Sequence, residues 1–250
     1  MESGGAAIAR AAAGESETDG SGRRPADSLS SLAYERIEDL IVHCRLQPGA
    51  DVRMQDLQTR VAIGRTPVHQ AVRRLAAETL IRIRPRDGLQ ISPIDLGRDR
   101  RLLQLRRDMD RFSVQLAAEK LDANQRNRLL RLGRALRERA GVMDVHEFNG
   151  HDRELDAIIL DAAAEPFLDR TLRPLHTIFR RTGHVYLTHL GGAAGLATTI
   201  ACHLDLLDAV EQRDPARASA ASDRLIEFAG SMFDRLEGAI DPAILDVGDG

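Results

Sequence analysis

Residues 64–75 read Gly-Arg-Thr-Pro-Val-His-Gln-Ala-Val-Arg-Arg-Leu, and this stretch decides the fold of the N-terminal part of the chain. Its apolar residues recur at the i, i+3, i+4, i+7 spacing that places them on one face of an α-helix. The opposite face is basic and amide-bearing. We expect Thr66 to be the N-cap and Pro67 the first helical residue, where its missing N–H costs nothing. The expected buried face consists of Val68, Ala71, Val72, Leu75 and Ala76.

The segments on either side of this helix complete a small domain. Upstream, a helical pattern of apolar residues stops at residues 47–49, which include Pro and Gly, and residues 55–61 predict a second, short helix. Downstream, Ile81–Arg84 alternates apolar and charged residues, as a half-buried strand does, and Leu89–Ile91 returns after a turn. Helices followed by a two-stranded wing predict a winged helix-turn-helix at residues 28–93.

Charge is distributed unevenly along the chain, whose formal net charge is −3. Residues 1–28 carry three Arg and five acids, a balance of −2. Residues 29–93 carry ten Arg and seven acids, a balance of +3, whereas residues 94–250 carry 22 basic residues and 26 acids, a balance of −4. A basic segment in an acidic protein indicates one domain that binds a polyanion, although a solvated charged face is a plainer alternative.

The predicted helix and wing have the side chains that DNA recognition needs. A helix in the major groove reads base edges with side chains near its N-terminus, and a wing tip with Gly and Arg can approach the backbone or the minor groove closely. We therefore predict double-stranded DNA as a partner. The candidate contacts are Arg65, Thr66, His69, Gln70 and Arg73 on the helix, with Arg86 and Gly88 on the wing.

The remainder of the chain predicts helices alone. From Asp95 to about Gly238 the sequence shows amphipathic stretches with no strand signal, and the low aromatic content of 3% favours packed helices. The fold class is therefore mainly α: a disordered leader at 1–27, the winged helix, an all-α bundle of six to seven helices at 94–240, and a frayed tail at 241–250. The expected helices span 95–121, 123–140, 144–163, 166–189, 194–213 and 215–238.

Two further features concern the location of the protein. Cys44 and Cys202 lie on apolar stripes and share no metal-type spacing, so we expect buried, reduced thiols. No apolar run approaches the roughly 18 residues of a membrane span, and the Ala-rich start lacks the order of a secretion signal. We expect a cytoplasmic protein.

Residues 30–92 resemble the GntR family of bacterial transcriptional regulators. The family's usual signature is Ser-Arg-Thr-Pro-Val-Arg-Glu-Ala-Leu-Arg-Arg-Leu, which residues 64–75 follow in most positions. The departures are Gly64, His69, Gln70 and Val72. The other matching segments are 34–37, 46–49, 80–81 and Gly88.

This resemblance implies which residues contact DNA. The family's contacts correspond to Arg65 and Thr66, with Gln55 on the preceding helix and Gly88 on the wing. His69 stands where the family has a DNA-contacting Arg, which would weaken a guanine contact or change the preferred operator. A winged helix used only for protein contacts is the alternative.

The helical half resembles the FCD ligand-binding domain of the FadR-type branch of that family. In such domains an Asp and three His bind a divalent metal, which helps to hold a carboxylate effector. Here Asp152 and His203 match, Asp156 replaces one His and Leu225 replaces another. The resemblance implies a weakly bound Mn, Mg or Zn on Asp152, Asp156 and His203, or else a lost metal with the acids partnered by Arg. The matching segments are 105–110, 115–118, 152–156, 162–168 and His203 with Ala209, Asp214 and Ala218.

The effector is expected to be a small organic acid bound by Arg106, Asp152, Asp156 and His203. Arg106 borders an apolar helix face and could clamp a carboxylate, although a surface ion pair with Asp110 is the commoner fate of such an Arg. The other histidines, His146, His151, His176, His184 and His189, are expected to be solvated or capping. Of these, His184 and His189 lie on a predicted helix from which they could face the cavity.

These features predict a homodimeric DNA-binding regulator, a repressor, whose binding to a near-palindromic operator is modulated by the acid. Two alternatives stay open. One is a metal-dependent hydrolase using Asp152, Asp156 and His203, and the other is an architectural DNA-binding protein without a ligand. Against an enzyme, the sequence has no nucleophile elbow, phosphate loop or glycine-rich cofactor turn, and we expect no catalytic residues.

Overall fold

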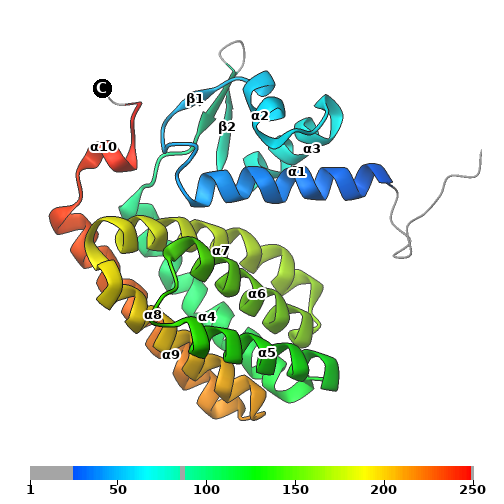
Figure 1. Cartoon of the computed structure of the whole chain (residues 1–250), viewed down its shortest axis with the longest axis vertical. Helices are drawn as coiled ribbons and strands as arrows, with labels where there is room; N and C mark the ends of the chain where they lie inside the picture. The colour runs from blue at the N-terminus through cyan, green and yellow to red at the C-terminus, as the bar shows by residue number, and fades with distance from the viewer. Residues whose placement is uncertain (1–24, 85–87, 249–250) are drawn as a thin grey trace, which may run out of the picture.

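The computed structural model of the chain describes residues 25–84 and 88–248. Within them, a winged helix-turn-helix lies above a bundle of long helices (Figure 1). This arrangement confirms the expected fold class. The predicted leader, residues 1–27, falls outside the described residues except for its last three, which begin the first helix.

The N-terminal domain packs its helices against a small antiparallel sheet. Strand order is β1-β3-β2, with Asp51 paired with Gln90, and Ile81 paired with Ile91. Strand β1 was not predicted, because its two residues are too few to show an alternating pattern. A core of aliphatic side chains from all of the helices holds the domain together. The elements are α1 (Pro25–Val42), β1 (Asp51–Val52), α2 (Met54–Val61), α3 (Arg65–Ala77), β2 (Ile81–Arg84) and β3 (Gly88–Ile91).

The start of α3 differs from the expectation. Gly64, in an extended conformation, is the N-cap, and Thr66 lies in the first turn instead. Pro67 is the third helical residue, where its missing N–H is still harmless because the first four N–H groups of a helix have no partner within it. Helix α3 therefore begins two residues earlier than the capping preferences of Thr66 and Pro67 suggest.

The wing is less buried than its alternating sequence predicts. In β2, Ile81 is buried but Ile83 is 53% exposed. The reason is that β2 is an edge strand of the sheet, whereas Leu89, directly opposite Ile83 on the central strand β3, is buried in the core.

The C-terminal domain consists of the helices that the sequence predicts. Most of them begin at an Asp whose side chain accepts a hydrogen bond from the backbone N–H three residues later: Asp95, Asp122, Asp144 and Asp214. Such caps satisfy donors that the helix leaves free, which is why the breaks were visible in the sequence. The elements are α4 (Leu96–Lys120), α5 (Ala123–Arg139), α6 (Val145–Ala163), α7 (Pro166–Tyr186), the π-helical turn η1 (Leu187–Gly191), α8 (Gly192–Glu211) and α9 (Pro215–Ala239).

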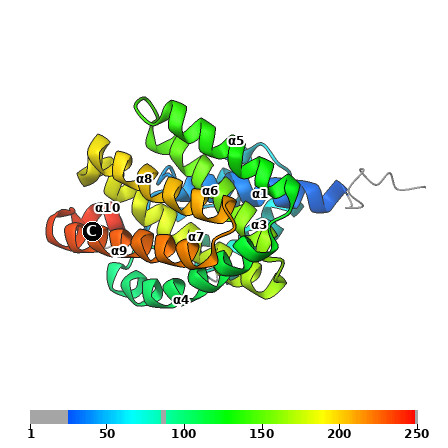
Figure 2. The ribbon, with the colours of Figure 1, turned by 90° about the horizontal axis from the view of Figure 1, so that it is seen from below.

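Helix α7 is the element shared by both domains. It contacts α4, α6 and α9 in the bundle and α1 in the winged helix, and the view from below places it among its bundle neighbours (Figure 2). Its buried side chains include charged and polar ones. They are His176, Thr177, Arg180, Arg181 and Thr182.

The C-terminal segment is ordered, so the expectation of a frayed tail is wrong for its described residues. It forms the short helix α10 (Pro242–Leu245). The N–H of Ile94 donates to Leu245 O at 2.9 Å, and the N–H of Val247 donates to Pro48 O at 2.9 Å. The chain end therefore contacts both the interdomain segment and the DNA-binding domain.

The two cysteines are free but only half-buried, in contrast to the expected buried thiols. Helix α1 ends at Val42, so Cys44 lies in the following turn with a φ of 52° and cannot share the stripe of that helix.

One continuous helical stretch, Pro166–Glu211, contains an 18-residue window of mean hydropathy 1.3, which is long and apolar enough to cross a membrane. From the sequence we expected no stretch that would meet this criterion. The stretch comprises α7, η1 and α8, which pack against α4, α5, α6 and α9. We therefore interpret it as core helices of the bundle.

Candidate functional site

The polar face of α3 forms the first candidate site, a nucleic-acid interface. All five predicted contacts on this helix are exposed: Arg65, Thr66, His69, Gln70 and Arg73. Within residues 25–84 and 88–248, no hydrogen bond or ion pair engages the guanidinium of Arg65 or Arg73. Arg74 differs, since it donates to Glu78 at 3.0 Å and lies 3.8 Å from the centre of the Tyr34 ring. Arg65 and Arg73 are thus available to DNA, whereas Arg74 serves the fold.

The remaining predicted DNA contacts lie on α2 and the wing. Gln55 is exposed near the start of α2. Gly88 has a φ of 95°, a conformation that residues with a Cβ rarely adopt, so Gly is required where the hairpin returns. Arg86 lies outside the described residues.

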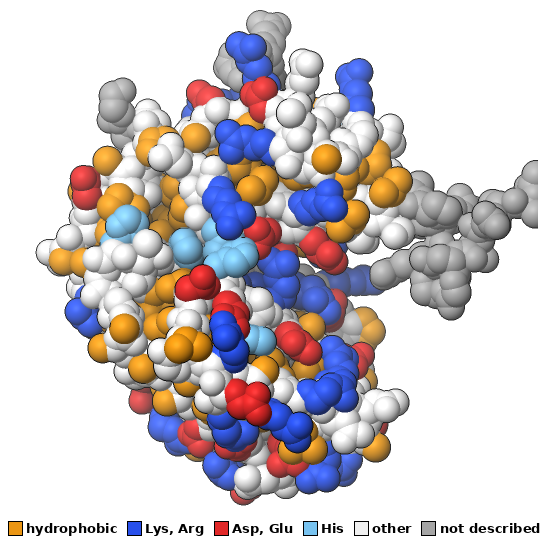
Figure 3. Space-filling model, in the orientation of Figure 1, with side chains coloured by type: hydrophobic (Ala, Val, Ile, Leu, Met, Phe, Trp, Pro, Cys, Tyr) orange, Lys and Arg blue, Asp and Glu red, His pale blue; other side chains and the backbone are white. Residues whose placement is uncertain are grey.

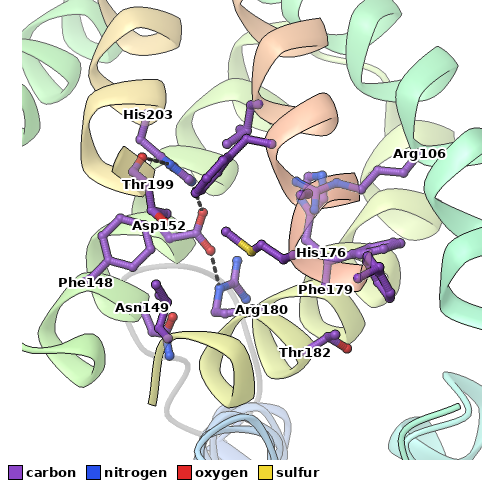
Figure 4. A pocket seen from close by; sticks show the side chains of 17 residues that line it. Arg106, Phe148, Asn149, Asp152, His176, Phe179, Arg180, Thr182, Thr199 and His203 are labelled. Atoms are coloured by element: carbon purple, nitrogen blue, oxygen red, sulfur yellow. Dashed lines mark hydrogen bonds and ion pairs between the residues drawn. The ribbon is translucent and has the colours of Figure 1, made fainter. Parts of the chain in front are cut away.

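The second candidate site is a pocket inside the bundle (Figure 4). Its volume is about 70 Å³, several times the 10–15 Å³ that one water molecule requires, so it can hold a small organic molecule. One wall is charged and the other is apolar. The apolar wall includes Phe179, Leu225, Phe228, Met232 and Phe233.

Arg180 lies at the centre of the charged wall. Its Nε donates to Asp152 Oδ2 at 2.6 Å, and its Nη2 donates to Asp156 Oδ2 at 2.5 Å. The two acids lie one turn apart on α6, as the sequence predicts, and Arg180 comes from α7. Burial alone would raise the pKa of Asp152, but the Arg180 guanidinium and His203 hold it well below its ordinary value.

His203, on α8, carries a positive charge in this arrangement. Its Nδ1 lies 2.8 Å from Thr199 O and its Nε2 lies 2.8 Å from Asp152 Oδ1. Both oxygens can only accept, so both ring nitrogens must donate. Burial opposes the charge, but the hydrogen bond to Asp152 raises the pKa of His203 above its ordinary value.

His176, on α7, is a second buried cation. Its Nε2 donates to Asp110 Oδ1 at 2.8 Å, and its Nδ1 lies 3.2 Å from Asp156 Oδ2, close enough for an ion pair but not aligned for a hydrogen bond. Burial would lower the pKa of His176, but the carboxylates of Asp156 and Asp110 raise it to about 9. The sequence prediction of a solvated or capping role is wrong for His176, which is 6% exposed.

Arg106 does form the ion pair with Asp110 that the sequence offers as an alternative, but the pair is not on the surface. Nε donates to Asp110 Oδ2 at 2.8 Å, and the Arg106 side chain is only 11% exposed. The guanidinium lines the pocket, 5.1 Å from the centre of the Phe179 ring. In the described part of the chain its Nη1 and Nη2 have no hydrogen-bond partner, so donors are left for a ligand.

The seven side chains that these ion pairs join do not balance in charge. Four groups are positive: Arg106, His176, Arg180 and His203. Three are negative: Asp110, Asp152 and Asp156. The charged wall therefore has one positive charge in excess, and an anion in the pocket would neutralise it.

The same geometry tests whether the residues fit the divalent metal of similar domains. The Arg180 guanidinium already bonds both carboxylates that a cation would need, and it remains charged at any ordinary pH. Leu225, at the fourth ligand position, lies on the apolar wall. The residues do not fit a metal, since a cation would have to displace a buried Arg.

Sequence reasoning missed Arg180 and His176. They lie one turn apart on α7, opposite the pair Asp152 and Asp156 on α6. Their i, i+4 spacing on a helix that also has an apolar face was the sequence signal that could have identified them. His184 and His189 do not line the pocket. Instead, His184 contacts His43, in the turn that follows α1, and His189 is exposed.

Comparison with known families matches both parts of the chain. Residues 101–228 match the FCD domain, and residues 29–91 match the bacterial regulatory proteins of the gntR family.

Individual relatives are similarly named. The HTH-type transcriptional repressor RspR of Escherichia coli K12 is 25% identical over 193 residues, which are 76% of this chain and 82% of that protein. An uncharacterized HTH-type transcriptional regulator from an unstable DNA locus of Streptomyces ambofaciens is 26% identical over 203 residues, which are 75% of this chain and 78% of that protein.

Solved structures share the fold. E. coli McbR/YncC superposes with a TM-score of 0.72, covering 84% of this chain and 98% of that chain at 18% identity. A GntR transcriptional regulator from Rhodococcus sp. RHA1 has a TM-score of 0.63, covering 86% and 100% at 17% identity.

The raised pKa of His176 predicts a pH-dependent stability. Its folded pKa is about 9 and an unperturbed His titrates near 6.5, so its contribution is complete below about pH 6.5 and is lost as the pH rises through about 9. The difference in unfolding free energy between the wild type and His176→Gln should therefore shrink by on the order of 3 kcal/mol over this range. Urea denaturation at a series of pH values measures it.

His151→Gln is the matched control, because His151 is a partly exposed histidine on α6 outside the network. It should reproduce the wild-type pH profile. A constant difference between wild type and His176→Gln from pH 6 to 9.5 would show that His176 is not held in the charged form.

Proposed function

The chain belongs to the gntR family of bacterial regulatory proteins and carries an FCD domain, and on this premise we propose that it is a repressor released from its operator by a small organic acid. It is a transcriptional regulator and not an enzyme, so the hydrolase interpretation of Asp152, Asp156 and His203 is wrong. The observation that carries the effector class is the excess of buried positive charge beside the bundle pocket.

The pocket suits a carboxylate with a short apolar body. Burying an anion is costly unless a cation and several donors receive it, and the free Nη groups of Arg106 offer a two-pronged arrangement for this purpose. The apolar wall would receive the remainder of the molecule. We assign Arg106 and His203 as contacts of the acid, with Asp152 and Asp156 orienting the cations through Arg180.

We propose that the pocket works without a divalent metal. In this chain Arg180 and His203 together neutralise the two acids of α6, which is the task a metal would otherwise perform. The net positive charge of the wall also favours an anionic ligand over a neutral one.

A route from the pocket to the DNA-binding domain runs through α7. One turn before Arg180, the hydroxyl of Thr177 donates to the buried Glu38 of α1, and Arg153 of α6 lies 3.3 Å from the same carboxylate. A ligand that shifts α7 would therefore alter the contacts of α1, which packs directly against α3. This would change the presentation of α3 to the operator.

Repression, dimerisation and location complete the proposal. RspR, a relative named above, is a repressor, which supports the same sign of regulation here. One winged helix covers only a half-site, so a useful operator is near-palindromic and its reader is a homodimer, with the symmetric contact in the sensor domain. A protein with these tasks works in the cytoplasm.

Operator binding should depend on Arg65. Arg65→Ala should lower specific affinity by about 1–3 kcal/mol, because a bidentate base contact is lost. The operator is first selected from random DNA with the wild-type protein, and affinities are then measured by gel shift at fixed salt.

Arg74→Ala is the matched control on the same helix, since it removes the same charge but its guanidinium is engaged by Glu78 and Tyr34. Arg74→Ala should lower the operator affinity clearly less than Arg65→Ala does. Wild-type operator affinity in Arg65→Ala would refute the assignment of α3 as the recognition helix.

The protein should sediment as a dimer at micromolar concentration, both free and bound to the operator. Analytical ultracentrifugation of the full chain measures this, and the selected operator should contain two half-sites related by a two-fold axis. A monomer under both conditions would contradict the dimer.

The effector should stabilise the protein, and Arg106 should be required for it. At a hundredfold excess over its dissociation constant, the correct acid should raise the unfolding free energy by roughly 2.7 kcal/mol through mass action. Thermal denaturation against a panel of small mono- and dicarboxylic acids identifies it. The same acid should weaken operator binding in gel shifts.

Arg106→Gln should abolish the stabilisation while leaving operator affinity intact, since Gln can still donate to Asp110. Arg107→Gln, one residue away and outside the pocket, should respond like the wild type. A full response from Arg106→Gln would mean that the acid binds elsewhere.

A further inference from the structure

Histidine side chains gather where the two domains meet, and Figure 3 shows them as a pale blue patch at the junction. His43 follows α1 of the winged helix, His146 lies at the start of α6 and His184 lies on α7. His146 Nδ1 is 3.0 Å from His43 Nε2, and the ring of His184 meets that of His43 edge-on at 5.1 Å. None of these histidines lines the effector pocket, so the cluster needs a separate explanation.

His43 is oriented as metal-binding histidines usually are. Its Nδ1 donates to Asp39 O at 2.8 Å and lies 3.1 Å from Asp39 Oδ1. This fixes the ring and leaves the Nε2 lone pair directed at His146 and at the Asn149 amide, 3.2 Å away. Ligating histidines typically use one nitrogen for the metal and donate the other N–H to a carbonyl or carboxylate.

The donor atoms are close enough for a single ion. One atom each from Asp39, His43 and His146 lies within 4.8 Å of the others. Two nitrogens bound to one tetrahedral Zn²⁺ at 2.0–2.1 Å would be roughly 3.3 Å apart, near the 3.0 Å between His43 Nε2 and His146 Nδ1. His184 lies outside this group of atoms but beside it, through its edge-on contact with His43, and its Nδ1 is buried without a hydrogen-bond partner in the described part of the chain, so it can supply a fourth donor.

A cation beside the cluster can move away from a bound metal. Arg45 Nη1 lies 4.0 Å from Asp39 Oδ2, but the Arg45 side chain is exposed and can turn into solvent.

We propose that His43, His146 and His184, with the carboxylate of Asp39, form an interdomain site for a borderline divalent transition metal such as Zn²⁺, Co²⁺ or Ni²⁺. Imidazole nitrogen selects these ions over Mg²⁺ and Ca²⁺. The site joins α1 of the DNA-binding domain to α6 and α7 of the sensor domain. A bound metal therefore restrains the two domains relative to each other, independently of an acid in the effector pocket.

Cobalt titration of the full-length, tag-free protein tests this site. Co²⁺ should bind with a stoichiometry of one per chain, producing the visible absorption of a nitrogen- and oxygen-ligated ion, and Zn²⁺ should displace it. His146→Gln should weaken Co²⁺ binding at least tenfold, and because His146 is exposed this variant should keep the wild-type fold. His151→Gln, five residues later on α6, should bind like the wild type.

Two further variants locate the ion. His43→Gln should weaken binding as His146→Gln does, whereas His203→Gln, in the effector pocket, should leave it unchanged. Wild-type affinity in His146→Gln, or no binding at millimolar Co²⁺, would overturn the proposal. So would loss of binding in His203→Gln alone, since it would place the ion in the bundle pocket.

Discussion

The guanidinium of Arg180 is the interaction on which the sensor domain depends. It bridges two largely buried carboxylates one turn apart on α6 and supplies the positive charge that their burial requires. Around this contact, His203 and His176 are fixed as cations, Arg106 is placed against Asp110, and the pocket acquires its positive character. The poor fit of these residues for a metal follows from this one side chain, and the proposed anion would bind beside it at Arg106.

Helix α7 connects the pocket to the DNA-binding domain. Most bundle helices have one face in the core and one in solvent, but α7 lies between the bundle and α1, so both its faces are buried. Its charged residues consequently pair with groups on either side: Arg180 and His176 with the sensor, and Thr177 with Glu38 of the winged helix. The pocket is therefore only one helix away from α1, which packs against α3, and no long-range pathway is needed between them.

The junction between the domains is polar, in contrast to the two cores beside it. The aliphatic clusters of the winged helix and of the bundle are nearly separate, and His43, Glu38, Arg153 and the C-terminal segment fill the space between them. Polar contacts of this kind depend on geometry, charge state and bound ions more than apolar packing does. An interface built in this way suits a protein whose domains must change their relative placement.

The sequence by itself determined the order of the helices, their boundaries to within a few residues, and the exposed basic face of α3. These features depend on local physics: the apolar period of 3.6, Asp caps, and Pro or Gly at breaks. It also placed Asp152 and Asp156 on one face, because that is a property of a single helix. Only the tertiary structure decided what those acids meet. Arg180 and His176 looked like ordinary polar residues of an amphipathic helix, since nothing in a linear pattern shows that a second domain covers the other face of α7. Burial of both faces turned surface charges into the centre of the site, and it brought His43 to His146 across 103 positions of sequence.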